Sequence, residues 1–171
     1  MKTKFVLFLI ALLSLTCTAI AGVPHDEPTS KITVTPIIVH RGDTTNIVVS
    51  LTNPEEKYNG FQMDLILPEG FSLCSSRRSG YLYELSERFG VLQPSVVIKK
   101  QDDGRYRILV FSFNQVPIKG NSGTIITLPI VINAKMKKGK YHGTMTNIIF
   151  NKEDNKGKSI EDVVFVIKVK K

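Results

Sequence analysis

The stretch of sequence that decides the fold is Arg41–Gly70, which reads RGDTTNIVVSLTNPEEKYNGFQMDLILPEG. It contains two apolar-rich runs, at 45–52 and 61–67, in which apolar residues recur at every second position. Because successive side chains of a strand point to opposite faces, each run predicts a strand with one apolar face. A polar turn with Pro54 joins the two runs, and glycine-bearing turns flank them. We therefore expect this stretch to form the first hairpin of a β-sandwich.

The same alternation continues along the rest of the chain. Further strands are expected at 31–39, 95–100, 105–113, 124–134, 143–150 and 160–169. Pro36 cannot donate a backbone hydrogen bond to a sheet, so the run at 31–39 should be an edge strand or should break and change sheet there. The turn Asp102-Asp103-Gly104 between two such runs predicts a β-hairpin. Gly139 and the polar connection 151–158 are expected to be turns.

Only the segment 68–94 lacks a regular pattern. Within it, Leu82, Leu85 and Phe89 are spaced three and four apart, as on one face of a short helix. Tyr81, Tyr83 and Leu85 alternate, as in an extended strand. Both conformations remain open for 81–89.

Strands separated by glycine- and asparagine-rich turns, with hardly any helical signal, are typical of all-β domains. We predict a two-sheet antiparallel β-sandwich of jelly-roll type, with about eight or nine strands and at most one short helix. The sequence shows neither a repeat nor a linker between domains. A single domain is therefore expected over 31–171.

The first residues have the pattern of a secretory signal peptide. Lys2 and Lys4 precede the apolar run 5–15, and Ala19-Ile20-Ala21 fits the small-residue cleavage rule. The pattern predicts a signal peptide at 1–21, cleaved after Ala21, and a protein that is secreted or held in the cell envelope. In the alternative reading, Cys17 would be the lipid-bearing first residue of the mature chain.

After cleavage, Gly22–Ser30 is expected to be a flexible lead-in. No later apolar run is long enough to predict a transmembrane segment. Cys74 would be the only thiol left, so an internal disulfide is excluded and core packing must stabilise the fold.

The whole chain carries a net charge of +8, with its basic residues scattered along the sequence. The one dense group is Lys135, Lys137, Lys138 and Lys140, which we interpret as a solvated turn. The positive charge favours an acidic partner or an anionic cell surface. Nucleic acid is not an expected partner, because aromatic and basic residues are not interleaved.

Several segments in this order resemble cohesin modules. They are Gly42-Asp43-Thr44 leading into 46–53, the run 60–67, the turn 120–123 before a long strand, and a final strand after an asparagine- and aspartate-bearing turn. The sequences of these segments are similar to cohesin-like domains of exported proteins from gut anaerobes, which share their fold with cellulose-binding modules. The resemblance implies a β-sandwich that binds dockerin modules in secreted polysaccharide-degrading assemblies. The segment 68–94 has no clear counterpart.

The run 105–113 carries apolar side chains on both faces, although a sheet needs only one apolar face to build a core. Ile108 and Val110 share one face, while Leu109, Phe111 and Phe113 share the other. The surplus is either covered by 68–94 or exposed for binding. A protein partner is expected to bind at Arg105, Arg107, Leu109, Phe111 and Phe113.

Two alternatives concern other ligands. A glycan could stack on exposed tyrosines, for which Tyr81 and Tyr83 are the candidates. Calcium prefers oxygen ligands at alternate positions, and the connection near 151–158 offers such a set, although lysines intervene. The candidate calcium ligands are Asn151, Glu153, Asn155 and Asp162.

Catalysis has little support in the sequence. His25, His40 and His142 lack the spacing of zinc ligands. Asp64 and Glu69 are read as a strand-exposed and a turn carboxylate, and they are not taken for an acid–base pair. We expect a non-catalytic binding module without a cofactor, and regard a glycan-acting enzyme as the third hypothesis.

Overall fold

The computed structural model of the chain describes residues 29–91 and 93–171. The predicted signal peptide at 1–21, the alternative lipid site at Cys17 and the lead-in up to residue 28 lie outside these residues. Within them, no helix has the length and apolar character needed to span a membrane.

The described residues form fourteen strands and one 3-10 helix, η1. Their bounds are β1 (Lys31–Val34), β2 (Ile37–His40), β3 (Thr44–Thr52), β4 (Tyr58–Ile66), β5 (Phe71–Leu73), β6 (Ser75–Ser76), β7 (Gly80–Tyr81), β8 (Glu84–Leu85), η1 (Glu87–Phe89), β9 (Ser95–Lys100), β10 (Tyr106–Phe111), β11 (Ser122–Ile132), β12 (Gly139–Lys152), β13 (Gly157–Ile160) and β14 (Val163–Lys170).

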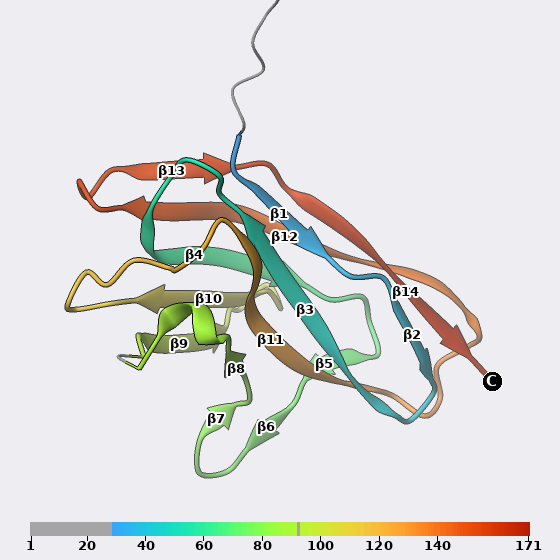
Figure 1. Cartoon of the computed structure of the whole chain (residues 1–171). Helices are drawn as coiled ribbons and strands as arrows, with labels where there is room; N and C mark the ends of the chain where they lie inside the picture. The colour runs from blue at the N-terminus through green and yellow to red at the C-terminus, as the bar shows by residue number, and fades with distance from the viewer. Residues whose placement is uncertain (1–28, 92) are drawn as a thin grey trace, which may run out of the picture.

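The strands build two packed sheets. Sheet A has the order β1-β3-β11-β5, with β8 added to β11, and sheet B has the order β2-β14-β12-β4-β10-β9, with β13 added to β12. Strands of sheet A cross in front of sheet B in Figure 1. The predicted all-β sandwich is confirmed, although it is cut into more strands than expected, and β2 pairs with β14 in parallel.

Side chains that alternate along the strands fill the space between the sheets. Ile47, Val49 and Leu51 of β3 are fully buried, as expected from their spacing. The core facing them from sheet B includes Phe61 of β4 and Phe150 of β12, whose rings lie 5.3 Å apart. Burial of these large side chains is the main favourable contribution to folding.

The chain changes sheet at Pro36, as one of the two readings predicted. β1 pairs with β3 in sheet A, whereas β2 pairs with β14 in sheet B. Both are edge strands. Because Thr35 and Pro36 lie between two ladders, the missing donor of the proline falls outside both sheets.

The expectation of a hairpin over Arg41–Gly70 is wrong. β3 and β4 are both strands, but β3 pairs with β1 and β11, while β4 pairs with β10 and β12. The turn between them therefore carries the chain from one sheet to the other. The predicted hairpin at Asp102-Asp103-Gly104 is confirmed, since β9 and β10 pair in antiparallel on either side of it.

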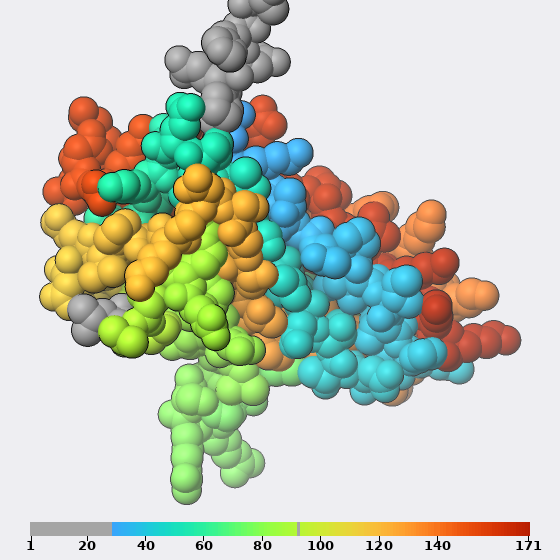
Figure 2. Space-filling model, viewed as in Figure 1, coloured from blue at the N-terminus to red at the C-terminus, as the bar shows by residue number. Residues whose placement is uncertain are grey.

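The segment 68–94 is neither a helix nor a strand over its whole length. Short strands β5 and β8 pair with β11 and widen sheet A. β6 and β7 pair only with each other, and Figures 1 and 2 show this hairpin projecting from the body of the molecule. The expected turn at Gly139 is also displaced, because β12 already begins at that residue.

Arg88 of η1 ties this segment to the end of the β3–β11 ladder. Its guanidinium donates to the carbonyl oxygens of Leu51 (3.0 Å), Gly123 (2.9 Å), Gly120 (2.8 Å) and Lys119 (2.6 Å). It also donates to Oδ1 of Asn53 at 2.7 Å. No carboxylate is among these partners, and burial lowers the pKa of Arg88. The arginine therefore works as a fixed set of hydrogen-bond donors.

Replacing Arg88 by methionine should destabilise the fold, because several partly buried acceptors lose their donor at once. We expect the free energy of unfolding to fall by about 3 kcal/mol. Urea unfolding followed by circular dichroism measures the change. Arg77→Met, on the exposed β6–β7 hairpin, is the matched control and should change stability by less than about 0.5 kcal/mol. Equal effects of the two substitutions would contradict this role of Arg88.

A second polar cluster surrounds Glu56 in the turn between β3 and β4. Lys152 and Lys158 donate to its Oε1 at 2.8 and 2.9 Å, and the Tyr58 hydroxyl donates to its Oε2. Partial burial alone would raise the pKa of Glu56, but these bonds hold it at about 2 instead of the usual 4.5. Burial and the bond to Glu56 raise the pKa of Tyr58. The Tyr58 Oη also lies 2.7 Å from Ser30 Oγ, so this residue of the lead-in is buried.

The low pKa of Glu56 predicts a defined acid sensitivity. Its ionised form stabilises the fold fully above the unfolded-state pKa of 4.5, and this contribution disappears as the pH falls to about 2. Glu56→Gln should therefore be less stable than the wild type near neutral pH, with a difference that vanishes near pH 2. The midpoints of urea unfolding of both proteins, measured along this pH range, test this prediction. A difference independent of pH would show that charge is not the cause.

Candidate functional site

Alternate side chains of the run 105–113 lie on the outer surface of sheet B, together with side chains from neighbouring strands. Leu109 of β10 is opposite Val97 of β9 on one side and Gln62 of β4 on the other. Gln62 is in turn opposite Ile149 of β12. Directly opposite residues of a sheet share a face. We call this surface the candidate face; it comprises Gln62, Asp64, Val97, Arg105, Arg107, Leu109, Phe111, Phe113 and Ile149.

Large apolar side chains on the candidate face are open to solvent. Val97 is 50% exposed, Leu109 38% and Phe113 83%. Phe113 lies beyond the end of β10, and its ring meets the half-buried ring of Phe111 edge-on at 5.0 Å. The segment 68–94 extends sheet A and leaves these side chains exposed. Clustered exposed apolar groups of this kind mark interaction surfaces.

Asp64 lies at the centre of the polar half of this face. Its carboxylate receives two bonds from Arg107, from Nε to Oδ1 at 2.8 Å and from Nη2 to Oδ2 at 2.9 Å. Nη1 of Arg105 donates to Oδ2 at 3.0 Å. The expectation that Asp64 is strand-exposed is wrong, since its exposed fraction is 0%. The two arginines cover it, and the Arg107 bonds lower the pKa of Asp64.

Both arginines are held in place but keep donors at the surface. Arg105 also bonds through Nε to Asp103 at 2.7 Å, and the side chains of Arg105 and Arg107 are 37% and 40% exposed. In the described part of the chain, no bond uses Nη2 of Arg105 or Nη1 of Arg107. Positively charged donors fixed in this way suit a carboxylate of a partner, because little side-chain entropy is lost on binding.

A shallow hollow of about 270 Å³ adjoins the apolar row. Its lining includes Leu109, Phe111 and Ile149, together with Gly60 and Gly157, which contribute no side chains. A Cβ atom on Gly60 would come within 2.6 Å of the Val110 carbonyl oxygen, so glycine is required there. The hollow is large enough to accept an apolar side chain of a partner.

The two tyrosines of the glycan hypothesis have different surroundings. Tyr81 packs edge-on against the buried ring of Tyr106 at 5.3 Å and is half-buried. Tyr83 is 42% exposed, between β7 and β8. The structure therefore offers one exposed ring in this segment and no paired platform of Tyr81 and Tyr83.

The candidate calcium ligands are spread along the β12–β13 hairpin and beyond it. The Asn151 side chain donates to Asn59 at 2.7 Å, and Asn155 occupies the turn in a left-handed conformation. Asp162 lies at the far end of β13. Among residues 29–91 and 93–171, no three His, Cys, Asp or Glu side chains are grouped as metal ligands would be.

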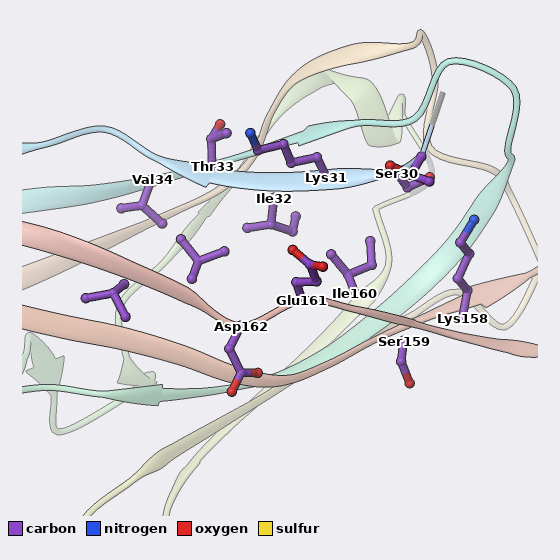
Figure 3. A pocket seen from close by; sticks show the side chains of 13 residues that line it. Ser30, Lys31, Ile32, Thr33, Val34, Lys158, Ser159, Ile160, Glu161 and Asp162 are labelled. Atoms are coloured by element: carbon purple, nitrogen blue, oxygen red, sulfur yellow. The ribbon is translucent and has the colours of Figure 1, made fainter. Parts of the chain in front are cut away.

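A cleft of about 740 Å³ opens at one edge of the sandwich between β1 and the β13–β14 corner. Figure 3 shows Ile32 and Ile160 facing this space, with Glu161 pointing towards β1 and Asp162 pointing away. The two neighbouring carboxylates therefore do not converge on one point, as acid–base catalysis would require.

Comparisons with solved structures show the fold of the chain. The seventh ScaB type I cohesin from Pseudobacteroides cellulosolvens is similar, with a TM-score of 0.65, 16% identity and coverage of 82% of this chain and 92% of that one. A structure of a cohesin–dockerin complex from Clostridium thermocellum is similar with a TM-score of 0.66 and 12% identity, and the match covers 82% of this chain and 99% of that one. A non-cellulosomal cohesin from the archaeon Archaeoglobus fulgidus is similar with a TM-score of 0.63 and 9% identity, and the match covers 83% of this chain and 91% of that one.

The chain thus has the cohesin-like fold that its sequence resembled. No protein-family model matches the sequence, and a search of curated proteins found no match either.

Part of the candidate face could be read from the sequence, and part could not. The row Leu109, Phe111 and Phe113 follows from alternation along one strand. Gln62 and Ile149 join it only through pairing with distant strands, which a single sequence does not reveal. No sequence signal marks Asp64 as buried, because it shares the polar face of its run with Gln62.

Replacing Asp64 by asparagine should destabilise the protein, because it leaves two arginines side by side without their shared anion. We expect a loss of about 2 kcal/mol in the free energy of unfolding. Asp103→Asn, which removes only the exposed partner of Arg105, should leave the stability almost unchanged. Urea unfolding of both variants measures the contrast, and an Asp64→Asn variant as stable as the wild type would refute it.

Proposed function

We propose that this chain, which has a cohesin-like fold, is a secreted, non-catalytic module that binds a dockerin-like protein through the candidate face. The observation that carries the proposal is the exposed apolar row of β10 beside the arginines clamped on Asp64. The similar fold found in a cohesin–dockerin complex from Clostridium thermocellum supports the class of partner. Its setting would be attachment at the cell exterior, within a polysaccharide-degrading system.

The face has the parts that a specific protein interface needs. Leu109 and Phe113 supply apolar area, and the hollow beside Ile149 can receive an anchoring side chain. Arg105 and Arg107 present charged donors next to it. A partner that fits would combine an apolar anchor with a nearby carboxylate. Arginine and aromatic residues are enriched in such interfaces, which agrees with this composition.

Binding to a panel of dockerin modules, measured by calorimetry, tests the proposal. The double variant Leu109→Ser/Phe113→Ser should weaken binding of the recognised dockerin by at least about tenfold, because it removes the exposed centre of the face. Ile38→Ser/Val164→Ser is the matched control, since it removes two exposed aliphatic side chains elsewhere on sheet B. It should leave the affinity unchanged.

Failure of every dockerin to bind, or an equal loss in both double variants, would overturn the proposal. A glycan array run beside the calorimetry addresses the alternative function. Glycan binding that Tyr83→Ala abolishes would favour a carbohydrate-binding module.

A further inference from the structure

Sheet B carries a second surface, at the end opposite to the candidate face, where lysines gather from strands distant in sequence. Lys140 of β12 is directly opposite Lys168 of β14, and Lys170 of β14 is opposite His40 of β2. All four side chains are exposed. We call this surface the lysine end; it comprises Lys140, Lys168 and Lys170, with Lys135, Lys137 and Lys138 in the preceding turn, and Arg41 and Lys171.

The tertiary structure turns a local run of lysines into a larger patch. The group at 135–140 reads as a solvated turn, but the fold sets the end of β14 beside it. The β11–β12 turn and the ends of β2 and β14 lie together at one end of the molecule in Figure 1, and side chains from these segments protrude there in Figure 2. Like charges directly opposite each other destabilise a sheet, so Lys140 and Lys168 reduce stability where they stand.

Acidic neighbours do not neutralise this end. β2, β12 and β14 contain no aspartate or glutamate. Asp43 lies 3.7 Å from His40, and Glu69 lines the same cavity as Lys135 and Lys137. In the described part of the chain, none of the lysines of this end is within salt-bridge distance of a carboxylate. The patch therefore keeps its positive charge available to a partner.

Exposed aliphatic side chains lie on the same outer face of sheet B as these lysines. Ile38 is opposite Lys168 and 61% exposed, and Val164 lies further along β14 with 65% exposed. Ile66 is 40% exposed and, like Val164, is opposite Thr144. Ile38 and the lysines of β12 and β14 line none of the described cavities. The surface is thus open, basic and partly apolar.

We propose that the lysine end binds an anionic phospholipid surface and lays the module against a membrane. Lysines attract anionic headgroups as point charges, and Ile38 and Val164 can enter the interface between them. A protein interface would be expected to have fewer lysines and more aromatic and arginine residues. A bound glycan would need a free aromatic platform, whereas Tyr141, which shares a cavity with Lys135 and Lys137, packs against Phe71 and donates to the Lys137 carbonyl oxygen. The inference is separate from the proposed dockerin face.

Vesicle co-sedimentation tests this with the chain starting at Gly22, because the apolar run 5–15 would itself enter lipid. The core of the described residues begins at Ile32 and is kept whole in this chain. The protein should bind phosphatidylcholine vesicles that contain phosphatidylglycerol and not those of phosphatidylcholine alone, and high salt should weaken binding. Lys140→Ser/Lys168→Ser/Lys170→Ser should lower partitioning about fivefold per lysine, and so on the order of 100-fold in total. Ile38→Ser/Val164→Ser should also lower it.

Lys31→Ser/Lys57→Ser/Lys119→Ser changes the net charge equally at exposed positions outside the lysine end and is the matched control. It should bind vesicles almost as the wild type does. Equal losses in the two triple variants would reduce the effect to net charge and overturn the proposal. Vesicle binding that is equally strong without phosphatidylglycerol would also overturn the proposal. Binding of an acidic polysaccharide or an acidic protein in place of vesicles would do the same. Dockerin affinity unchanged in the lysine variant would keep the two surfaces distinct.

Discussion

Ile47, Val49 and Leu51 on sheet A pack with Phe61, Met63 and Leu65 on sheet B in one apolar core, with 1% exposure at most. This single apolar layer is the constraint on which the other features depend. A strand that supplies one face to this layer turns its other face outward. Sheet B has seven strands against five in sheet A, and both surfaces proposed for binding lie on its outer face. The packing of the interior thereby decides which side chains remain on the outer faces and are available for binding.

Polar residues stabilise the places where the apolar layer ends. Arg88 satisfies carbonyls at the end of the β3–β11 ladder, and Glu56 gathers two lysines and Tyr58 at the crossing between sheets. Asp64 is the exception on an outer face, since it is fully buried beneath two arginines. Its burial fixes charged donors beside an apolar row, which prepares a surface for binding before any partner arrives.

The local features of this fold were accessible from the sequence because they depend on neighbours in the chain. Alternation located the strands, the missing donor of Pro36 located a change of sheet, and Gly104 marked a hairpin. The choice between sheets was not accessible, because β3 and β4 look like a hairpin when only the turn between them is considered. β3 already has β1 and β11 as neighbours, and these pairings join residues far apart in sequence.

By itself, therefore, the sequence determined a β-sandwich and the apolar row of one strand, since period-two alternation is a property of each strand alone. The cohesin-like type came from the resemblance of its motifs to that family. The tertiary structure alone decided which strands are paired, and with that the burial of Asp64 by arginines about forty residues away. It also decided that lysines of β12 and β14 face outward together. Such side chains become neighbours only through pairing between distant strands, and no local pattern records which strands will pair.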